Sequence, residues 1–134
     1  MDFQSKKAIY LQIADYVCEK ILLNLWKEKD KIPSVRELAV SLEVNPNTVV
    51  RTYAFLEENK IISMQRGIGY FVSEGGFLAA MELKKEEFLT EDLPHVFKTM
   101  DLLGVDIKNI SKLYSSCGRH PRECGDPDHK RSKS

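Results

Sequence analysis

The 134-residue sequence has little cysteine, no net charge and no long apolar run. Three cysteines, Cys18, Cys117 and Cys124, are too few and too unevenly spread for the disulfide framework of a small secreted protein, so we interpret them as reduced thiols. No segment approaches the about 20 apolar residues of a membrane span, and residues 1–10 lack a signal-peptide core. These absences predict a cytoplasmic protein with no membrane partner.

The sequence also lacks the residue patterns of catalysis. It contains no nucleophile–base constellation, phosphate-binding loop or paired-carboxylate motif, so we expect neither an enzyme nor a bound cofactor. Small-molecule pockets generally need about 300 Å³ or more, and no segment is left over to build one, which leaves any effector ligand unknown. Because the formal net charge is zero, binding to nucleic acid would require a locally basic face.

Apolar residues recur at helical spacing near the N-terminus. This stripe predicts a helix within residues 7–26 and contains Ile9, Ile13, Val17 and Ile21. Cys18 lies on the same stripe, so we expect it to pack in the core rather than to react.

Two further helices are predicted to follow each other closely. Ser34 and Glu37 form a capping box, in which the serine accepts from the backbone of the glutamate and the glutamate returns the bond. Asn45 suits the N-cap of the next helix and Pro46 its first position, because proline lacks the N–H that would be unsatisfied there. Two helices joined by so short a connection form a helix-turn-helix.

The outer side of this third helix is polar near its start. When Val49 is placed at the centre of the buried face, Asn47, Thr48 and Arg51 fall on the outer side. Short polar side chains and one guanidinium suit phosphate oxygens and guanine edges. The ring of Tyr53 is expected to face the core, while its hydroxyl could reach a phosphate.

Two short apolar segments follow the third helix. Residues 61–65 and 70–72 read as strands of a hairpin around Arg66-Gly67-Ile68-Gly69, whose two glycines permit positive φ. A basic hairpin directly after a helix-turn-helix is a wing. The sequence therefore predicts an α+β, mostly α, fold with a winged helix-turn-helix domain in residues 1–75.

Gly75-Gly76 marks the expected domain boundary. Residues 76–116 are predicted to be helical, with apolar stripes at Leu93, Val96, Phe97, Met100 and Leu103 and at Ile107, Ile110, Leu113 and Tyr114. So short a segment cannot readily bury these stripes alone, so we expect a self-association module. Residues 117–134 lack periodicity and are predicted to be disordered.

Three stretches together resemble the GntR family of bacterial transcription regulators: PSVRELA at 33–39, VNPNTV at 44–49, and RGIGYFV at 66–72. The NPNTV form and the short C-terminal part look like the YtrA subfamily. The resemblance implies a homodimer that binds an inverted-repeat DNA operator, with each recognition helix in a major groove and each wing near a minor groove. In the subfamily the C-terminal helices form the dimerisation module, and such regulators often repress transporter operons.

The resemblance also implies which side chains contact DNA. By matching position, the candidates are Arg36, Asn47, Thr48, Arg51, Tyr53, Arg66, Gly67 and Gly69.

Two other functions stay open from the sequence. A winged helix that serves as a protein-interaction adaptor fits the zero net charge and the apolar Val50 and Ala54 on the third helix. A metal-responsive regulator fits zinc-ligand residue types at the C-terminus, namely Cys117, His120, Cys124 and His129. A repressor is the preferred interpretation, because neither alternative accounts for the three motifs together.

Overall fold

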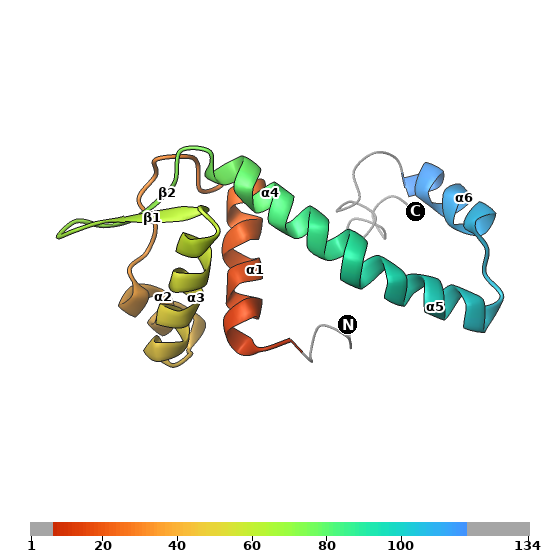
Figure 1. The fold of residues 1–134 in the computed structure, drawn as a ribbon, viewed down its shortest axis with the longest axis horizontal. Coiled ribbons are helices and arrows are strands. Elements are labelled where there is room, and N and C mark those ends of the chain that lie inside the picture. Colours follow the sequence, from red (N-terminus) through yellow and green to blue (C-terminus); the bar gives the residue numbers. More distant parts are fainter. Residues whose placement is uncertain (1–6, 118–134) are drawn as a thin grey trace. The chain divides into compact units, whose positions relative to one another are not determined.

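A computed structural model describes residues 7–117 of the chain and shows a mostly helical fold with one small sheet (Figure 1), which confirms the predicted fold class. The chain divides into two compact units, the first ending at Phe88 and the second beginning at Leu89. In chain order the elements are α1 (Ile9–Leu22), α2 (Val35–Leu42), α3 (Pro46–Glu58), β1 (Ile62–Gln65), β2 (Gly69–Val72), α4 (Gly76–Glu87), the π-helical segment η2 (Phe88–Asp92), α5 (Leu93–Leu103) and α6 (Ile107–Cys117). Within residues 7–117 no helix is long and apolar enough to span a membrane.

Local side chains fix the starts of α2 and α3 as the sequence predicts. Ser34 Oγ accepts the Glu37 N–H at 3.1 Å, and Glu37 Oε1 accepts the Ser34 N–H at 2.9 Å. At the next helix, Asn45 Oδ1 accepts the Asn47 N–H at 2.8 Å, and Pro46 occupies the first turn. These caps satisfy N–H groups that have no partner within the helix, so the two helices begin at defined residues.

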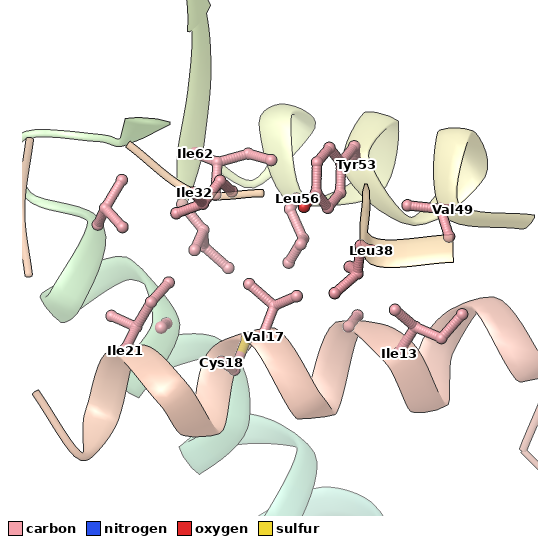
Figure 2. Packing of buried hydrophobic residues seen from close by; sticks show 14 of the residues in the cluster. Ile13, Val17, Cys18, Ile21, Ile32, Leu38, Val49, Tyr53, Leu56 and Ile62 are labelled. Atoms are coloured by element: carbon pink, nitrogen blue, oxygen red, sulfur yellow. The ribbon is translucent and has the colours of Figure 1, made fainter. Parts of the chain in front are cut away.

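The core of the first unit lies between α1 and the pair α2 and α3. Figure 2 shows Val17 of α1 facing Leu38 of α2 and Leu56 of α3. Val17, Val49, Tyr53 and Leu56 are all completely buried. Burial of one such apolar side chain contributes about 1.5–3 kcal/mol. The rotation of α3 about its own axis is therefore set by its contacts with α1 and α2.

The wing is an antiparallel hairpin that extends away from the helices (Figure 1). In the hairpin, Ser63 pairs with Phe71 and Gln65 pairs with Gly69. The second strand therefore begins at Gly69, one residue earlier than predicted. Gly67, in the turn, has φ +79°, a conformation that favours glycine. A third segment, absent from the sequence prediction, also pairs with β2: the Ile32 N–H donates to the Tyr70 carbonyl at 2.9 Å.

Helix α4 packs against α1, so the first unit extends beyond the boundary expected at Gly75-Gly76. Gly76 and Ala80 are both buried. The glycine pair was expected to mark a domain boundary, but the missing side chain of Gly76 allows the backbone to approach Ile61 closely. The first turn of α4 is thus part of the core.

Four charged side chains also join α4 to α1. Lys7 Nζ lies 2.8 Å from Asp15 Oδ2 and 2.6 Å from Glu87 Oε2. Lys84 forms ion pairs with the same two carboxylates. Burial alone would raise the pKa of Glu87, but hydrogen bonds from Lys7 and Lys84 bring it below its ordinary value. The carboxylate is therefore stabilised in its charged form between the two lysines.

The first helix ends earlier than the sequence predicts, and the end of α3 is set by a left-handed lysine. The first helix stops at Leu22, and Asn24 has a left-handed φ of 64°. After α3, the left-handed residue is Lys60 with φ 63°, although asparagine, present at position 59, adopts this conformation more readily. The Asn59 side chain instead donates to the Phe55 carbonyl at 2.9 Å, which stabilises a right-handed conformation at that residue.

The second unit, taken by itself, contains two helices that bury no side chain. Helix α5 ends at Gly104, whose φ is +72°. Asp106 Oδ1 accepts the Asn109 N–H at 3.0 Å, which caps the start of α6. The large apolar side chains exposed on these helices are Val96, Phe97, Leu102, Leu103, Ile107, Leu113 and Tyr114.

The close approach of α4 to Ile61 and Val72 predicts a strong effect of a small substitution. A Cβ at Gly76 would lie 2.5 Å from the Ile61 carbonyl oxygen and 3.0 Å from Val72 Cγ1. We expect Gly76→Ala to lower the free energy of unfolding by about 1–3 kcal/mol, as overpacked core sites do. Urea denaturation measures this loss. Leu78→Ala, on the exposed side of α4, is the control, and equal stability of both variants would contradict the expected clash.

Candidate nucleic-acid interface

The start of α3 presents the predicted polar side chains outward. Asn47 and Arg51 are exposed and Thr48 is half-buried, whereas Val49 between them is completely buried. Because Val49 and Tyr53 pack into the core, the helix cannot rotate to hide its polar side. Asn47, Thr48 and Arg51 therefore lie on one outward surface.

Three arginines on separate elements carry positive charge at the surface. Arg36 lies in the first turn of α2, Arg51 on α3 and Arg66 in the hairpin turn, and each is exposed. In the part of the chain that the structure describes, none of them takes part in a salt bridge. Their charges are therefore available to phosphate oxygens, although the whole molecule is neutral.

The wing tip exposes both backbone and charge. Arg66 and Gly67 are exposed, and Gly69 is half-buried at the start of β2. The Ile68 N–H donates to the Gln65 carbonyl at 2.9 Å, which closes the turn. A turn built around glycine offers little steric hindrance to a phosphate backbone.

Lys31 is a cation beside the wing that sequence reasoning missed. A Cβ at Gly69 would lie 3.0 Å from Lys31 Cε and 3.7 Å from its Nζ, so the lysine side chain lies across this glycine. Backbone pairing between Lys31 and Phe71 brings the two segments together. No local motif announces this pairing, because it joins residues 40 positions apart. Gly69 thus provides space for a lysine, in addition to any contact of its own.

Tyr53 is corrected from a candidate DNA contact to a core residue. Its side chain is completely buried, and its hydroxyl donates to the Pro33 carbonyl at 2.7 Å. Its ring meets that of Tyr70 edge-on, with centroids 4.7 Å apart. Burial also raises its pKa above the ordinary range. The sequence correctly predicted that the ring faces the core, but it left the hydroxyl free to reach a phosphate. Its actual acceptor is a backbone carbonyl 20 residues away, which residue spacing does not reveal.

The proposed metal ligands lie almost entirely outside the described residues. His120, Cys124 and His129 are beyond residue 117, and Cys117 is disulfide-bonded in the structure. The expectation of reduced thiols is thus wrong for Cys117 and confirmed for the buried Cys18, because a low cysteine count excludes a framework but not a single bond. Residues 7–117 contain no cluster of ligand side chains that could hold a metal.

A helix-turn-helix with a polar and cationic outer side, followed by a basic hairpin, defines a winged-helix DNA-binding domain. Residues 9–72 match the family described as bacterial regulatory proteins, gntR family. The HTH-type transcriptional regulator YhcF of Bacillus subtilis (strain 168) is 40% identical over 103 residues, covering 77% of this chain and 84% of YhcF. The HTH-type transcriptional repressor YtrA of the same organism is 36% identical over 110 residues, covering 82% and 84%.

The solved structures agree with these relatives. A GntR-family transcriptional regulator from Bacteroides thetaiotaomicron superimposes with a TM-score of 0.66 at 46% identity, covering 81% of this chain and 95% of that one. The chain therefore belongs to the GntR family of bacterial regulatory proteins, as its three sequence motifs indicated. It is a DNA-binding transcriptional regulator.

The buried hydroxyl of Tyr53 predicts an effect on stability without an effect on DNA binding. We expect Tyr53→Phe to lower the free energy of unfolding by about 0.5–1.5 kcal/mol, since it removes one hydrogen bond. Denaturation and DNA titration of the same variant measure both properties. Tyr70→Phe is the matched control. Weaker DNA binding by Tyr53→Phe, at unchanged stability, would instead support a contact between the Tyr53 hydroxyl and a DNA phosphate.

Proposed function

We propose that the protein is a homodimeric repressor that reads an inverted-repeat operator through α3 and the wing, acts in the bacterial cytoplasm and has no catalytic activity. The observation that carries the proposal is the outward surface of α3. Its first turns hold Asn47, Thr48 and Arg51 in a rigid frame of buried neighbours.

The exposed groups divide into two chemical roles. Asn47, Thr48 and Arg51 would enter the major groove, where amides read adenine and guanidinium groups read guanine. Val50 is 52% exposed and would contact a thymine methyl group, which is the apolar feature of that groove. An exposed valine on the recognition helix therefore does not require the adaptor function.

The remaining candidates would hold the backbone of the DNA. Arg36 on α2 would contact phosphate, as the first helix of a helix-turn-helix commonly does. Arg66 and Gly67 at the wing tip, together with Lys31 beside Gly69, would lie along a neighbouring groove. Such contacts fix the register of the protein without specifying sequence.

The C-terminal helices support the proposed dimer. Helices α5 and α6 bury none of their own side chains, and Phe97 and Tyr114 are 47% and 61% exposed. Isolated helices of this length are marginal in water, and their stability in proteins comes from packing an apolar side. A second copy of the chain would supply that packing. Dimerisation would then link two weak half-site readers, so that simultaneous engagement provides the affinity.

Repression is the regulatory direction that the comparisons favour. The relative YtrA is named a repressor, and the match covers most of both chains. A dimer seated on an operator would exclude polymerase without needing a further contact surface.

Binding selection from a random duplex pool tests the DNA-reading proposal. We expect an enriched inverted repeat, with half-sites about 10 base pairs apart or a multiple of that. Arg51→Ala should weaken binding by about 1–3 kcal/mol and relax the preference at one base pair. For comparison, Arg36→Ala should weaken binding equally on all DNA sequences. It should also reduce the slope of log K against log salt concentration by about one.

Exposed Lys85 on α4 provides a charge control, because Lys85→Ala removes a cation without touching α3 or the wing. No enrichment at low salt by folded, dimeric protein would contradict the repressor and favour the adaptor. Equal losses for Arg51→Ala on selected and random DNA would assign Arg51 to the phosphate backbone.

Substitution on α5 tests the dimer. We expect Phe97→Glu to convert the protein to monomers, because it places a charge on the apolar surface proposed to be buried. Sedimentation equilibrium measures the association state. The neighbouring Lys98→Glu also introduces a carboxylate in α5, on an already charged position, and should leave the dimer intact. A wild-type monomer, or a Phe97→Glu dimer of unchanged affinity, would contradict the proposal.

A further inference from the structure

The guanidinium of Arg51 lies on an aromatic ring from another helix. Arg51 Cζ is 3.9 Å from the centroid of the Tyr10 ring. Tyr10 belongs to α1, 41 positions earlier in the chain. The distance is well inside the about 6 Å range of a cation–π contact. An exposed arginine is thus held against α1 before any DNA arrives.

Tyr10 is itself held against α3 through its backbone and its ring, by two residues that follow Arg51. The Tyr10 carbonyl accepts from Thr52 Oγ1 at 2.8 Å, and Thr52 is completely buried. The Tyr10 ring also meets the Phe55 ring at right angles, with centroids 6.2 Å apart. Because Thr52 and Phe55 lie close to Arg51 on α3, these contacts hold the Tyr10 ring beside the arginine.

Stacking occupies the face of a guanidinium and leaves its donors free. The N–H groups of arginine radiate in the plane of the group, whereas the aromatic ring contacts the plane from one side. A stacked arginine can therefore still donate two parallel hydrogen bonds to a base or a phosphate. A free arginine side chain would first have to lose its rotamer freedom, which weakens binding.

We infer that Tyr10 is a positioning residue that preorganises Arg51 for base recognition, so that α1 contributes to sequence specificity without touching DNA. The inference rests on the proposed function, because it needs Arg51 at the DNA. Under this inference, Tyr10 of α1 acts together with Arg51, Thr52 and Phe55 of α3 in base recognition.

A set of four variants tests this role on the DNA enriched by wild-type selection. Tyr10→Leu should weaken binding about two- to fivefold, in line with an exposed cation–π contact, and should relax the same base preference as Arg51→Ala. Tyr10→Phe keeps the ring and should retain wild-type affinity. In an Arg51→Ala background, Tyr10→Leu should have no further effect.

Tyr16→Leu is the matched control for loss of a ring. Tyr16 is also a half-buried tyrosine of α1 with a lysine over its ring, Lys20 at 5.1 Å. Its ring meets that of Trp26 edge-on, and the cation over it is not Arg51. This variant should not change base preference. Thermal unfolding of every variant shows that the comparison is made between folded proteins.

A measurement without DNA separates the inference from the proposed function. The δ-methylene protons of Arg51 should show an upfield ring-current shift in the NMR spectrum of the full chain. The shift should persist in Tyr10→Phe and vanish in Tyr10→Leu. If these protons resonate at ordinary positions in the wild type, the stack does not exist in solution and the inference is wrong.

The binding results discriminate in the same way. A wild-type chain that selects no DNA overturns the proposed function, whatever the NMR spectrum shows. Normal wild-type selection with unchanged Tyr10→Leu affinity overturns the inference alone. Tighter binding by Tyr10→Leu would mean that the ring sequesters Arg51. An equal loss of affinity on Tyr10→Leu substitution in the wild type and in Arg51→Ala would mean that Tyr10 has a merely structural role. Either result would also overturn the inference.

Discussion

The burial of one side of α3 is the constraint on which the proposed DNA-reading surface depends. Val49, Tyr53 and Leu56 are completely buried among residues of α1 and α2 (Figure 2). A helix held at three successive positions of its inner side has one allowed rotation. Because that rotation is fixed, Asn47 and Arg51 point outward with little freedom. Stability and the proposed recognition of DNA therefore use opposite sides of the same 13-residue helix.

The charges of the first unit are divided by role. The ion pairs of Lys7 and Lys84 with Asp15 and Glu87 join α4 to α1, whereas Arg36, Arg51 and Arg66 form no ion pair within residues 7–117. A neutral protein can thus present local positive charge to phosphates without a strong long-range field. Such a protein would bind random DNA weakly, so that its selectivity would depend more on base contacts and on the proposed dimer.

Much of the candidate site could be predicted because its signals are local. The caps at Ser34 and Asn45, the position of Pro46 and the turn glycine Gly67 act within a few residues of themselves, so sequence spacing suffices to find them. The parts that were missed join distant segments. Lys31 reaches Gly69 through pairing of a loop with β2, and the Tyr53 hydroxyl finds the Pro33 carbonyl. Periodicity contains no information about such partners.

By itself the sequence determined the order of the elements, the inward stripes of α1 and α3, and the family that its three motifs identify. These follow from helical spacing, capping chemistry and turn residues, all of which act along the chain. Only the tertiary structure decided that α4 is part of the first unit, that Tyr53 lies in the core and that Arg51 rests on Tyr10. The physical reason is that each depends on close packing between residues far apart in sequence, where shape and distance select the partner.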